Sequence, residues 1–469
     1  MTYLLLVIFG SLNFERINID TQIYPHGIWA ADINGDGAKK VDIIGLWSTG
    51  AAWYEHTANI NTWIAHPIAT TSSNFGEISA ADFDKDGDND LIFTVRPSNQ
   101  IWVCINNGAG SFTTSAITTG FSSPRYCYPA DVNNDGNMDF VAGHQTSSAT
   151  AFWFKNNGSA SFTPMPVGTE IFSSAWKVYP FDANADNHFE VLVSGYANNS
   201  VFWMQNNGSE SFTKILVSGA ITYPAGIAAA DLDNDGDKDV VVSEAYTGTR
   251  LLWYENNGGT FIEHLLQTGL DWDGVDIGDI DLDGDIDIVA CNKNDANTGS
   301  VRLYENMGGK NFLEQIIDPL VPEADIPYIV EIDDDSCPDI VVSDAVDTNG
   351  YFILYHQNCG GAVEEKETPN SFVCKVYPSP VFSSAQFEIT VSQQSIAALK
   401  IYNTTGSLVY ETSKELTNGV NKIPWNTRDM RGKLLNSGAY FYKLELKSYG
   451  KTCNCHRTTK TSGKLIVFR

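Results

Sequence analysis

The sequence predicts an all-β protein, a seven-bladed β-propeller followed by a small β-sandwich. Three observations support this prediction. An acidic nine-residue loop recurs seven times at nearly constant spacing, a tryptophan-containing segment keeps the same period, and the composition changes near residue 365. A repeat of about 50 residues indicates a solenoid, a propeller or a linear array.

The composition is that of a globular chain with a strongly acidic first part. Hydrophobic residues make up 43 % of the 469 residues, so a sizeable core can form. Residues 1–365 carry 14 Lys/Arg against 51 Asp/Glu, whereas residues 366–469 carry 15 against 6. This change predicts a domain boundary at the polar linker 362–370. The net charge of −28 argues against nucleic acid as a partner and favours cations.

The N-terminus and the cysteines are less informative. Residues 1–13 are apolar from Tyr3 to Phe9, and they are either a signal-peptide remnant or an ordinary buried strand. No stretch reaches the roughly 20 apolar residues that a membrane-spanning helix needs. The eight cysteines lack a zinc-ligand spacing and allow disulfides in an exported protein, but the sequence does not specify their pairing.

The acidic loop sets the period of the chain. Its copies begin at Asp32, Asp82, Asp131, Asp182, Asp231, Asp279 and Glu331, at intervals of 50, 49, 51, 49, 48 and 52 residues. The tryptophans follow the same spacing at Trp53, Trp102, Trp153, Trp203 and Trp253, with Leu303 and Leu354 at this position in the last two repeats. We expect these tryptophans in the core.

Each repeat is expected to contain four short antiparallel strands. The first leads into the acidic loop, as in GIAAAD (226–231), and the second is a Val/Ile run such as DVVVSE (239–244). The third carries the tryptophan, and the fourth begins at an aromatic residue after an Asn-Gly turn. Four short strands per repeat are typical of a propeller blade.

The two ends of the repeat region complement each other. No aromatic fourth strand follows the last repeat at NCGG (358–361), whereas FERINI from Phe14 precedes the first acidic loop. The N-terminal strand can therefore complete the last blade, which closes a ring over residues 14–361. An open solenoid is less favoured because it would leave both sheet edges unpaired.

The acidic loops have the composition of calcium sites. Positions 1, 3, 5 and 9 carry oxygen side chains, which suits the six to eight oxygen ligands of calcium, and glycine at position 6 permits a sharp turn. Magnesium fits less well because it demands tight octahedral geometry, and zinc would favour His or Cys. The expected ligands of up to seven calcium ions are Asp32, Asn34, Asp36, Asp42, Asp82, Asp84, Asp86, Asp90, Asp131, Asn133, Asp135, Asp139, Asp182, Asn184, Asp186, Glu190, Asp231, Asp233, Asp235, Asp239, Asp279, Asp281, Asp283, Asp287, Glu331, Asp333, Asp335 and Asp339.

The seven loops do not match this pattern equally. The second, third, fifth and sixth fit it in full. The first has two additional residues, so that Asp42 stands at position 11, and the fourth has Asn187 at position 6 and Glu190 at position 9. The seventh begins with Glu331 and has Ser336 at position 6. We expect these three loops to bind calcium weakly or not at all, and the role of calcium to be structural.

The loops and the NNG…F turns resemble FG-GAP/VCBS repeats, which occur in integrin α-chain heads, certain fungal lectins and bacterial surface proteins. The resemblance covers about residues 14–360. It implies a seven-bladed propeller with calcium loops on one face, and it leaves the ligand open.

Residues 371–469 lack the acidic loop and alternate apolar with polar residues in LKIYN (399–403) and AYFYKLEL (439–446). This pattern predicts a small β-sandwich. The segment is similar to the FlgD-like immunoglobulin-like domain that serves as a type IX secretion sorting signal. The matching residues are Pro378, Pro380, Ile401 to Gly406, Trp425, Gly432, Gly438 to Tyr440 and Lys464 to Arg469.

Two features of this segment depart from that family, namely Ser379 in place of asparagine and the long stretch 447–464. The resemblance implies export across the outer membrane of a gram-negative bacterium, followed by release or surface attachment. A plain accessory β-domain is the alternative.

The connections that differ between blades are expected at the face opposite the acidic loops, and a ligand is expected there. They offer aromatic rings beside polar groups, a combination that suits sugars. The candidate residues are Tyr24, His26, Trp47, Arg96, Arg125, Tyr126, His144, Trp176, Tyr196, Tyr223, Tyr246, Trp272 and Lys293.

The favoured function is a secreted, monomeric binding or adhesion module for carbohydrate. The alternatives are a protein-binding adhesin, a polysaccharide lyase or dehydratase on a propeller scaffold, and a structural filament component. An enzyme is less favoured because the eight histidines are scattered and no GxSxG nucleophile motif occurs. It would require residues such as His26, His144, Arg125 and Lys293 to converge near the axis.

Overall fold

The computed structural model describes residues 12–36, 41–57, 59–70, 75–118, 120, 122–146, 150–169, 172, 174–183, 186–293, 299–333, 335–346, 349–357, 373–377, 384–391, 395–403, 407–436, 438–449 and 456–467. These residues form β-strands and one 3₁₀ turn, η1 (Tyr196–Asn198). The chain divides into two compact units, Ser11–Gly361 and a unit that contains Ala362–Arg469. Among the described residues, no helix has the length and apolarity that a membrane crossing requires.

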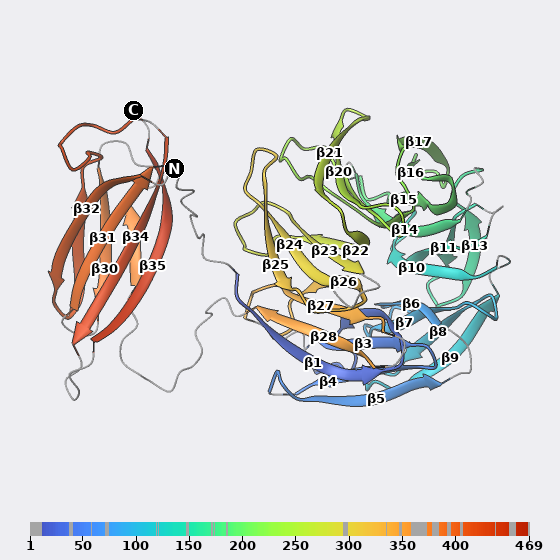
Figure 1. Ribbon diagram of the computed structural model, residues 1–469. Helices are drawn as coiled ribbons and strands as arrows, with labels where there is room; N and C mark the ends of the chain where they lie inside the picture. The colour runs from blue at the N-terminus through green and yellow to red at the C-terminus, as the bar shows by residue number, and fades with distance from the viewer. Residues whose placement is uncertain are drawn as a thin grey trace. The chain divides into compact units, whose positions relative to one another are not determined.

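Seven four-stranded antiparallel sheets make up the first unit (Figure 1). Blade 1 contains β2 (Pro25–Ala31), β3 (Asp42–Trp47), β4 (Gly50–His56) and β5 (Trp63–Thr70); blade 2 contains β6 (Phe75–Ala81), β7 (Asp90–Val95), β8 (Gln100–Asn106) and β9 (Phe112–Thr118); blade 3 contains β10 (Pro124–Ala130), β11 (Asp139–His144), β12 (Phe152–Asn156) and β13 (Phe162–Pro166). Blade 4 contains β14 (Ala175–Phe181), β15 (Glu190–Gly195), β16 (Ser200–Asn206) and β17 (Phe212–Ser218), and blade 5 contains β18 (Pro224–Ala230), β19 (Asp239–Glu244), β20 (Arg250–Asn257) and β21 (Thr260–Thr268). Blade 6 contains β22 (Asp271–Gly278), β23 (Asp287–Lys293), β24 (Ser300–Asn306) and β25 (Phe312–Asp318), and blade 7 contains β26 (Ala324–Val330), β27 (Asp339–Asp344), β28 (Gly350–Gln357) and β1 (Phe14–Gln22).

The sheets form a closed ring, which confirms the propeller fold. The first strand of each blade contacts the first strand of the next, and β26 of blade 7 contacts β2 of blade 1. Strand β1 pairs with β28 in an antiparallel ladder that runs from Phe14↔Gln357 to Gln22↔Gly350. The N-terminal strand thus completes the last blade, and Figure 1 shows β1 beside β28.

The burial of each strand follows its place in the blade. The second strands are buried along their length, as in β19 (DVVVSE), because neighbouring sheets cover both of their faces. The fourth strands, such as β21, are largely exposed. Trp53, Trp153, Trp203 and Trp253 are buried between blades as the sequence predicts, whereas Trp102 is only partly buried.

In five blades, a buried side-chain amide at the end of the third strand bridges the blade to its predecessor. The donor and acceptor pairs are Asn106 Nδ2 to Ile33 O (2.7 Å), Asn156 to Phe83 O (2.7 Å), Asn206 to Val132 O (2.9 Å), Asn306 to Leu232 O (2.7 Å) and Gln357 Nε2 to Ile280 O (3.1 Å). Each acceptor is position 2 of the preceding acidic loop. The sequence predicts only a turn for these asparagines, so the amide bridge between blades is a finding of the structure.

The second unit is a β-sandwich. One sheet has the order β29 (Val373–Tyr377), β30 (Ala385–Val391), β33 (Gly419–Trp425), and the other has the order β32 (Leu408–Leu416), β31 (Ser395–Asn403), β34 (Gly438–Tyr449), β35 (His456–Val467). Both sheets contribute to one core, which includes Phe387, Leu399, Trp425 and Leu444. The Trp425 indole N–H donates to the carbonyl of Arg428 at 3.3 Å.

Several sequence predictions fall on other parts of the chain. Residues 1–11, the linker 362–370, Pro378, Ser379, Pro380, Gly406 and Arg469 lie outside the described residues. Of the cysteines, Cys104, Cys127 and Cys291 are free and buried, and Cys337 is disulfide-bonded.

Replacing Asn156 with alanine should lower the free energy of unfolding by about 2–4 kcal/mol, because Phe83 O and Met138 O lose a buried hydrogen-bond donor. The midpoint of urea denaturation measures this change. Asn157→Ala is the matched control, because Asn157 caps an exposed turn at Ser159, and a change within about 0.5 kcal/mol is expected. Equal effects of the two substitutions would contradict the bridging role.

Candidate functional site: an axial mouth opposite seven acidic loops

The two ends of each first strand face opposite ends of the propeller. In blade 1, Ala31 pairs with Asp42 at the end that bears the acidic loop, and Pro25 pairs with Trp47 at the other end. The same register recurs in the other blades. We call the second end, at which the first strands begin, the mouth.

At the acidic end, the first loop residue organises the turn. In blade 5 the Asp231 carboxylate accepts the backbone N–H of Asp235 at 3.1 Å and of Gly236 at 3.0 Å. Gly236 has φ of +98°, so the glycine at position 6 permits this turn. The loops of blades 2, 3 and 6 repeat these contacts at Gly87, Gly136 and Gly284.

The last carboxylate of each loop is part of the scaffold. Asp239 is buried, and its two oxygens accept the N–H groups of Leu232 and Asn256 at 2.9 and 2.8 Å. The equivalent groups are Asp42, Asp90, Asp139, Glu190, Asp287 and Asp339, and all are buried. Burial raises the pKa of Asp239 to about 7, although the two N–H donors oppose the rise.

In several loops, the carboxylates within one loop lie close enough together to bind a single cation. Ligand atoms within 4.8 Å of one another come from Asp82, Asp84 and Asp86, from Asp231, Asp233 and Asp239, from Asp279, Asp281 and Asp287, and from Glu331, Asp333 and Asp335. Burial and then repulsion from Asp287 and Asp283 raise the pKa of Asp281 to about 7. An all-oxygen set of mutually repelling carboxylates fits calcium.

The weaker loops differ from one another. In blade 7 the three acidic side chains do converge, and one buried oxygen of Asp333 has no hydrogen-bond partner, so this loop has the geometry of a cation site despite Ser336. In blade 4, Asn184 lies outside the described residues, as does Lys40 in blade 1. His356 adds a possible nitrogen ligand beside Asp333 and Asp339.

At the mouth, two positions of each blade surround the axis. In six blades they directly follow the pair of residues at the mouth end of the ladder between the first and second strands. In blade 6 they follow the pair Trp272↔Asn292, and Lys293 pairs in addition with Asp271. On the first strands they are His26, Gly76, Arg125, Trp176, Ala225, Asp273 and Asp325. At the second strands they are Ser48, Arg96, Gln145, Tyr196, Ala245 and Ala345, each the residue directly after the strand, and Lys293, the last residue of β23. Ten of these fourteen residues, with Tyr24, Tyr126 and Tyr246, line one cavity of about 110 Å³.

A charged hydrogen-bonded chain crosses this cavity between blades 7, 1 and 2. His26 Nδ1 lies 2.6 Å from Asp325 Oδ2, and the Arg96 guanidinium contacts His26 Nε2. Arginine can only donate, so His26 carries its proton on Nδ1 and accepts from Arg96 on Nε2. Burial, helped by Arg96 and Lys293, lowers the pKa of His26 to about 4, which keeps the imidazole neutral.

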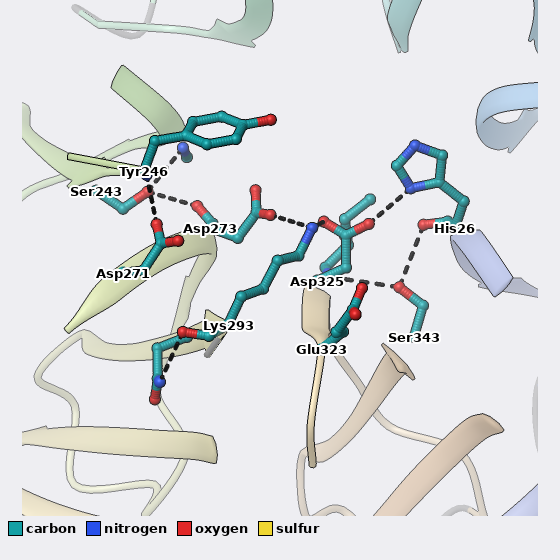
Figure 2. Close-up of polar contacts among 12 residues, drawn as sticks. His26, Ser243, Tyr246, Asp271, Asp273, Lys293, Glu323, Asp325 and Ser343 are labelled. Atoms are coloured by element: carbon teal, nitrogen blue, oxygen red, sulfur yellow. Dashed lines mark hydrogen bonds and ion pairs between the residues drawn. The ribbon is translucent and has the colours of Figure 1, made fainter. Parts of the chain in front are cut away.

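Asp325 joins this chain to a lysine. Lys293 Nζ lies 3.2 Å from Asp325 Oδ1 and also contacts Asp273, as Figure 2 shows. Burial alone would raise the pKa of Asp325, but Lys293 and His26 hold it well below its usual range. The carboxylate is therefore ionised, and it fixes both Lys293 and the imidazole ring.

Hydroxyl groups hold the backbone of the mouth in place. Thr94 Oγ1 donates to Arg125 O at 2.7 Å, and Ser343 Oγ donates to His26 O at 3.2 Å. Each hydroxyl lies on a second strand and reaches the first strand of the next blade. The repeated bridge therefore sets the position of the residues around the axis.

An aromatic wall lines the side of the mouth formed by blades 3 to 5. The guanidinium carbon of Arg125 lies 3.7 Å from the centroid of the Trp176 ring, and Trp176 stacks on Tyr196 at 4.5 Å. Tyr223 and Tyr246 extend the wall, with ring centroids 5.1 and 6.0 Å from that of Tyr196. Tyr223 and Tyr246 have φ of +49° and +56°, a conformation that bulky residues adopt at a cost and that clusters at functional sites.

Four candidate residues from the sequence do not line the cavity: Tyr223 belongs to the aromatic wall outside it, and the other three are Trp272, His144 and Trp47. Trp272 is fully buried in the core, and His144 is buried with its Nε2 lying 3.0 Å from Thr150 O. Trp47 is half-buried against the core of blades 1 and 7. Trp272, His144 and Trp47 each belong to the residue pair that comes directly before the axial positions of their blade. A shift of one residue reverses the side-chain direction in a strand, so their side chains point away from the cavity.

Asp325 is the central residue that the sequence search missed. It stands in ADIPYIV (324–330) at the position that His26 occupies in blade 1, so aligning the seven repeats on the first strand would have revealed it. Asp325 lies in a first strand as His26, Arg125 and Trp176 do, but the ligand-binding residues predicted from the sequence include none from blade 7.

Below the mouth lies a central cavity of about 230 Å³, which the first strands line. Lys177 and Glu77 face it, and the ammonium of Lys177 lies 5.0 Å from the centroid of the Tyr126 ring. Burial raises the pKa of Glu77 to about 8 and lowers the pKa of Lys177. Burial thus brings both groups closer to neutrality.

Sequence profiles match both units of the chain. The FG-GAP-like repeat matches four times, at residues 82–142, 131–193, 182–242 and 231–290, and the secretion system C-terminal sorting domain matches residues 375–454. The sorting domain marks the chain for secretion to the outer surface of a gram-negative cell, as the resemblance in the sequence implies. No match was found among curated proteins.

Several solved structures are similar to the chain at low identity. PorZ, a surface component of the type IX secretion system of Porphyromonas gingivalis, is 13 % identical over 92 % of this chain with a TM-score of 0.45, and the chain spans 58 % of its length. YCF48 from Cyanidioschyzon merolae is 14 % identical over 73 % of this chain and 98 % of its own, with a TM-score of 0.46. A mutant of AofleA from Arthrobotrys oligospora is 8 % identical over 65 % and 90 %, with a TM-score of 0.43. Likenesses of this degree do not establish a shared function.

His26 should remain neutral well below the pH at which an ordinary histidine becomes protonated. Nitrogen-15 NMR of the histidine ring should show Nδ1–H and an unprotonated Nε2 from pH 8 to pH 5.5, because burial lowers the pKa to about 4. The pKa of His26 in the folded protein lies below its unfolded value. The contribution of His26 to the free energy of unfolding is therefore lost as the pH falls from about 6.5 toward 4. Titration of this ring near pH 6.5 would contradict the buried Asp325–His26–Arg96 chain.

Proposed function

Because the chain combines FG-GAP-like repeats with a secretion sorting domain, we propose that it is a secreted, calcium-stabilised propeller that binds carbohydrate at the mouth. The observation that carries this proposal is the aromatic wall of Trp176, Tyr196, Tyr223 and Tyr246 beside buried hydrogen-bonding groups. Sugar rings have apolar faces and polar edges, so they need both kinds of surface. Tyr246 is 66 % exposed and Tyr223 is 37 % exposed, which leaves the wall accessible.

The acidic loops supply the calcium part of the proposal. Their carboxylates would hold the ion, and calcium would neutralise charge where Asp231, Asp233 and Asp239 converge. In blade 5 the Lys310 ammonium lies 3.2 Å from Asp233 Oδ2, and this contact with a positive group supports the proposal. A bound ion at 100 times its dissociation constant would add about 2.7 kcal/mol of stability per site.

The second candidate function is a polysaccharide-active enzyme, either a lyase or a dehydratase. It is favoured by the convergence of His26, Arg96, Arg125, Tyr126 and Lys293 around one cavity, as acid–base chemistry would require. Against it, both ring nitrogens of His26 already have partners, so the ring offers no free base. A time-dependent appearance of unsaturated sugar in wild-type incubations would favour the enzyme.

Removal of calcium with EDTA should lower the melting temperature of the propeller. Asp233→Ala should reduce the calcium-dependent part of the melting temperature, because one ligand of the fifth loop is lost. Asp237→Ala is the matched control, since Asp237 lies in the same loop outside the convergent set and should leave the calcium increment unchanged. Identical melting curves with calcium and with EDTA would refute calcium stabilisation.

A glycan array should show saturable binding that Tyr246→Ala weakens by about tenfold or more, the loss of roughly 1.4 kcal/mol of aromatic contact, because Tyr246 is the most exposed ring of the wall. The control is Leu216→Ala, which removes an exposed apolar side chain from an outer strand. Absence of binding to every glycan, or equal losses for both variants, would contradict a carbohydrate site at the mouth. Binding to a protein partner instead would identify an adhesin.

A further inference from the structure

Two arginines of the mouth have no carboxylate partner among the described residues. Arg96 contacts only the neutral ring of His26, and its buried Nε has no hydrogen-bond partner. Arg125 donates from Nε and Nη2 to Gln145 Oε1, at 3.1 and 2.7 Å, and stacks on Trp176. Nearby Asp273 and Asp325 are instead engaged by Lys293. Two arginines without a carboxylate partner are unusual here, because residues 1–365 carry 51 acidic and only 14 basic side chains.

The two guanidinium groups lie close to each other around the cavity. Both groups line it. Burial lowers the pKa of Arg125 to about 10, and repulsion from Arg96 is the second-largest cause of this shift. Blade 2 has Gly76 at its axial position, where a Cβ would come within 2.1 Å of Thr94 Oγ1, 2.9 Å of Arg125 O and 3.3 Å of Arg96 Nε. The absence of a side chain at this position leaves room for the hydrogen bond from Thr94 to Arg125 O and for Arg96 beside it.

Such a pair costs stability unless an anion binds between its members. Burial penalises each positive charge, and the mutual repulsion adds to that penalty. A carboxylate accepts hydrogen bonds from a guanidinium group that lies in its own plane. A carboxylate between the two arginines would therefore offset the burial of their charges and also their mutual repulsion. Arg125 and Tyr196 cover the two faces of Trp176, so a sugar ring attached to that carboxylate would lie against Tyr223 and Tyr246, the exposed rings that extend the wall.

We propose that the mouth recognises a uronic acid unit of an acidic polysaccharide, with its carboxylate held by Arg96 and Arg125 and its ring against the exposed part of the aromatic wall at Tyr223 and Tyr246. This inference rests on the proposed carbohydrate binding and specifies its substrate class. A neutral sugar would satisfy the aromatic wall and leave the arginine pair unpaired. Lys293 does not take part in the anion contact, because Asp273 and Asp325 already neutralise it.

The test compares two matched probes on the wild-type protein by isothermal titration calorimetry. Oligogalacturonate carries the carboxylate, and its methyl ester has the same rings without the charge. Oligogalacturonate should bind at least tenfold more tightly, and the difference should shrink at high salt. Equal affinity for both probes, or preference for the ester, would overturn the proposal while leaving carbohydrate binding intact.

Variants locate the charge recognition on the arginine pair. Arg125→Gln and Arg96→Gln should each abolish the preference for the free acid, whereas Lys85→Gln should not, because it removes one positive charge at the acidic end. A melting curve of each variant confirms that it is folded, and the wild-type comparison of the two probes decides the question even if a variant fails to fold. Preference retained in both arginine variants would overturn the assignment. Binding of sulfated but not carboxylated sugars would also overturn it, and failure to bind any saccharide would refute the proposed function itself.

Discussion

The pairing of β1 with β28 is the constraint on which the propeller depends. It joins residues more than 300 positions apart, since Phe14 pairs with Gln357 and Gln22 pairs with Gly350. The pairing removes the two free sheet edges that an open array would expose. It also brings blade 7 against blade 1, so that Ser343 Oγ reaches the carbonyl of His26 and Asp325 reaches the His26 ring. The centre of the mouth therefore exists only in the closed ring.

The two ends of the propeller use the repeat in opposite ways. At the acidic end, most blades repeat the same contacts: the last acidic residue of the loop receives backbone N–H groups, and an amide from the next blade binds the loop carbonyl. At the mouth, the equivalent positions hold an imidazole (His26), a guanidinium (Arg125), an indole (Trp176) and two carboxylates (Asp273 and Asp325). Identical contacts at one end make the scaffold uniform, and this uniformity leaves the other end free to differ from blade to blade.

Much of the fold could be predicted from the sequence, because the period of the acidic loops and the complementary ends specify a ring of four-stranded units. The site could be predicted only in part. His26, Arg96, Arg125 and Lys293 do converge, but Trp272, His144 and Trp47 stand one residue away from the axial positions, and in a strand that single step reverses the side chain. Loop boundaries read from sequence are not accurate to one residue, and only a residue-by-residue alignment of the seven first strands separates the two positions.

Other features depend on partners that sequence spacing does not indicate. Asn156 looks like an ordinary turn residue, and its acceptor Phe83 O lies 73 residues earlier in the preceding blade. Asp325 acquires its importance from Lys293 and from His26, 299 residues away. These contacts arise from the closed ring, and the local sequence around each residue contains no signal for them.

Hydrogen exchange of the propeller with and without saturating oligogalacturonate tests most directly whether the closed ring assembles one binding surface at the mouth. We predict slower exchange in segments 24–27, 123–126, 174–177 and 323–326 together, because these blades meet around one cavity. The seven acidic loops should exchange at unchanged rates. Protection confined to the acidic loops, or to a single blade, would contradict the account.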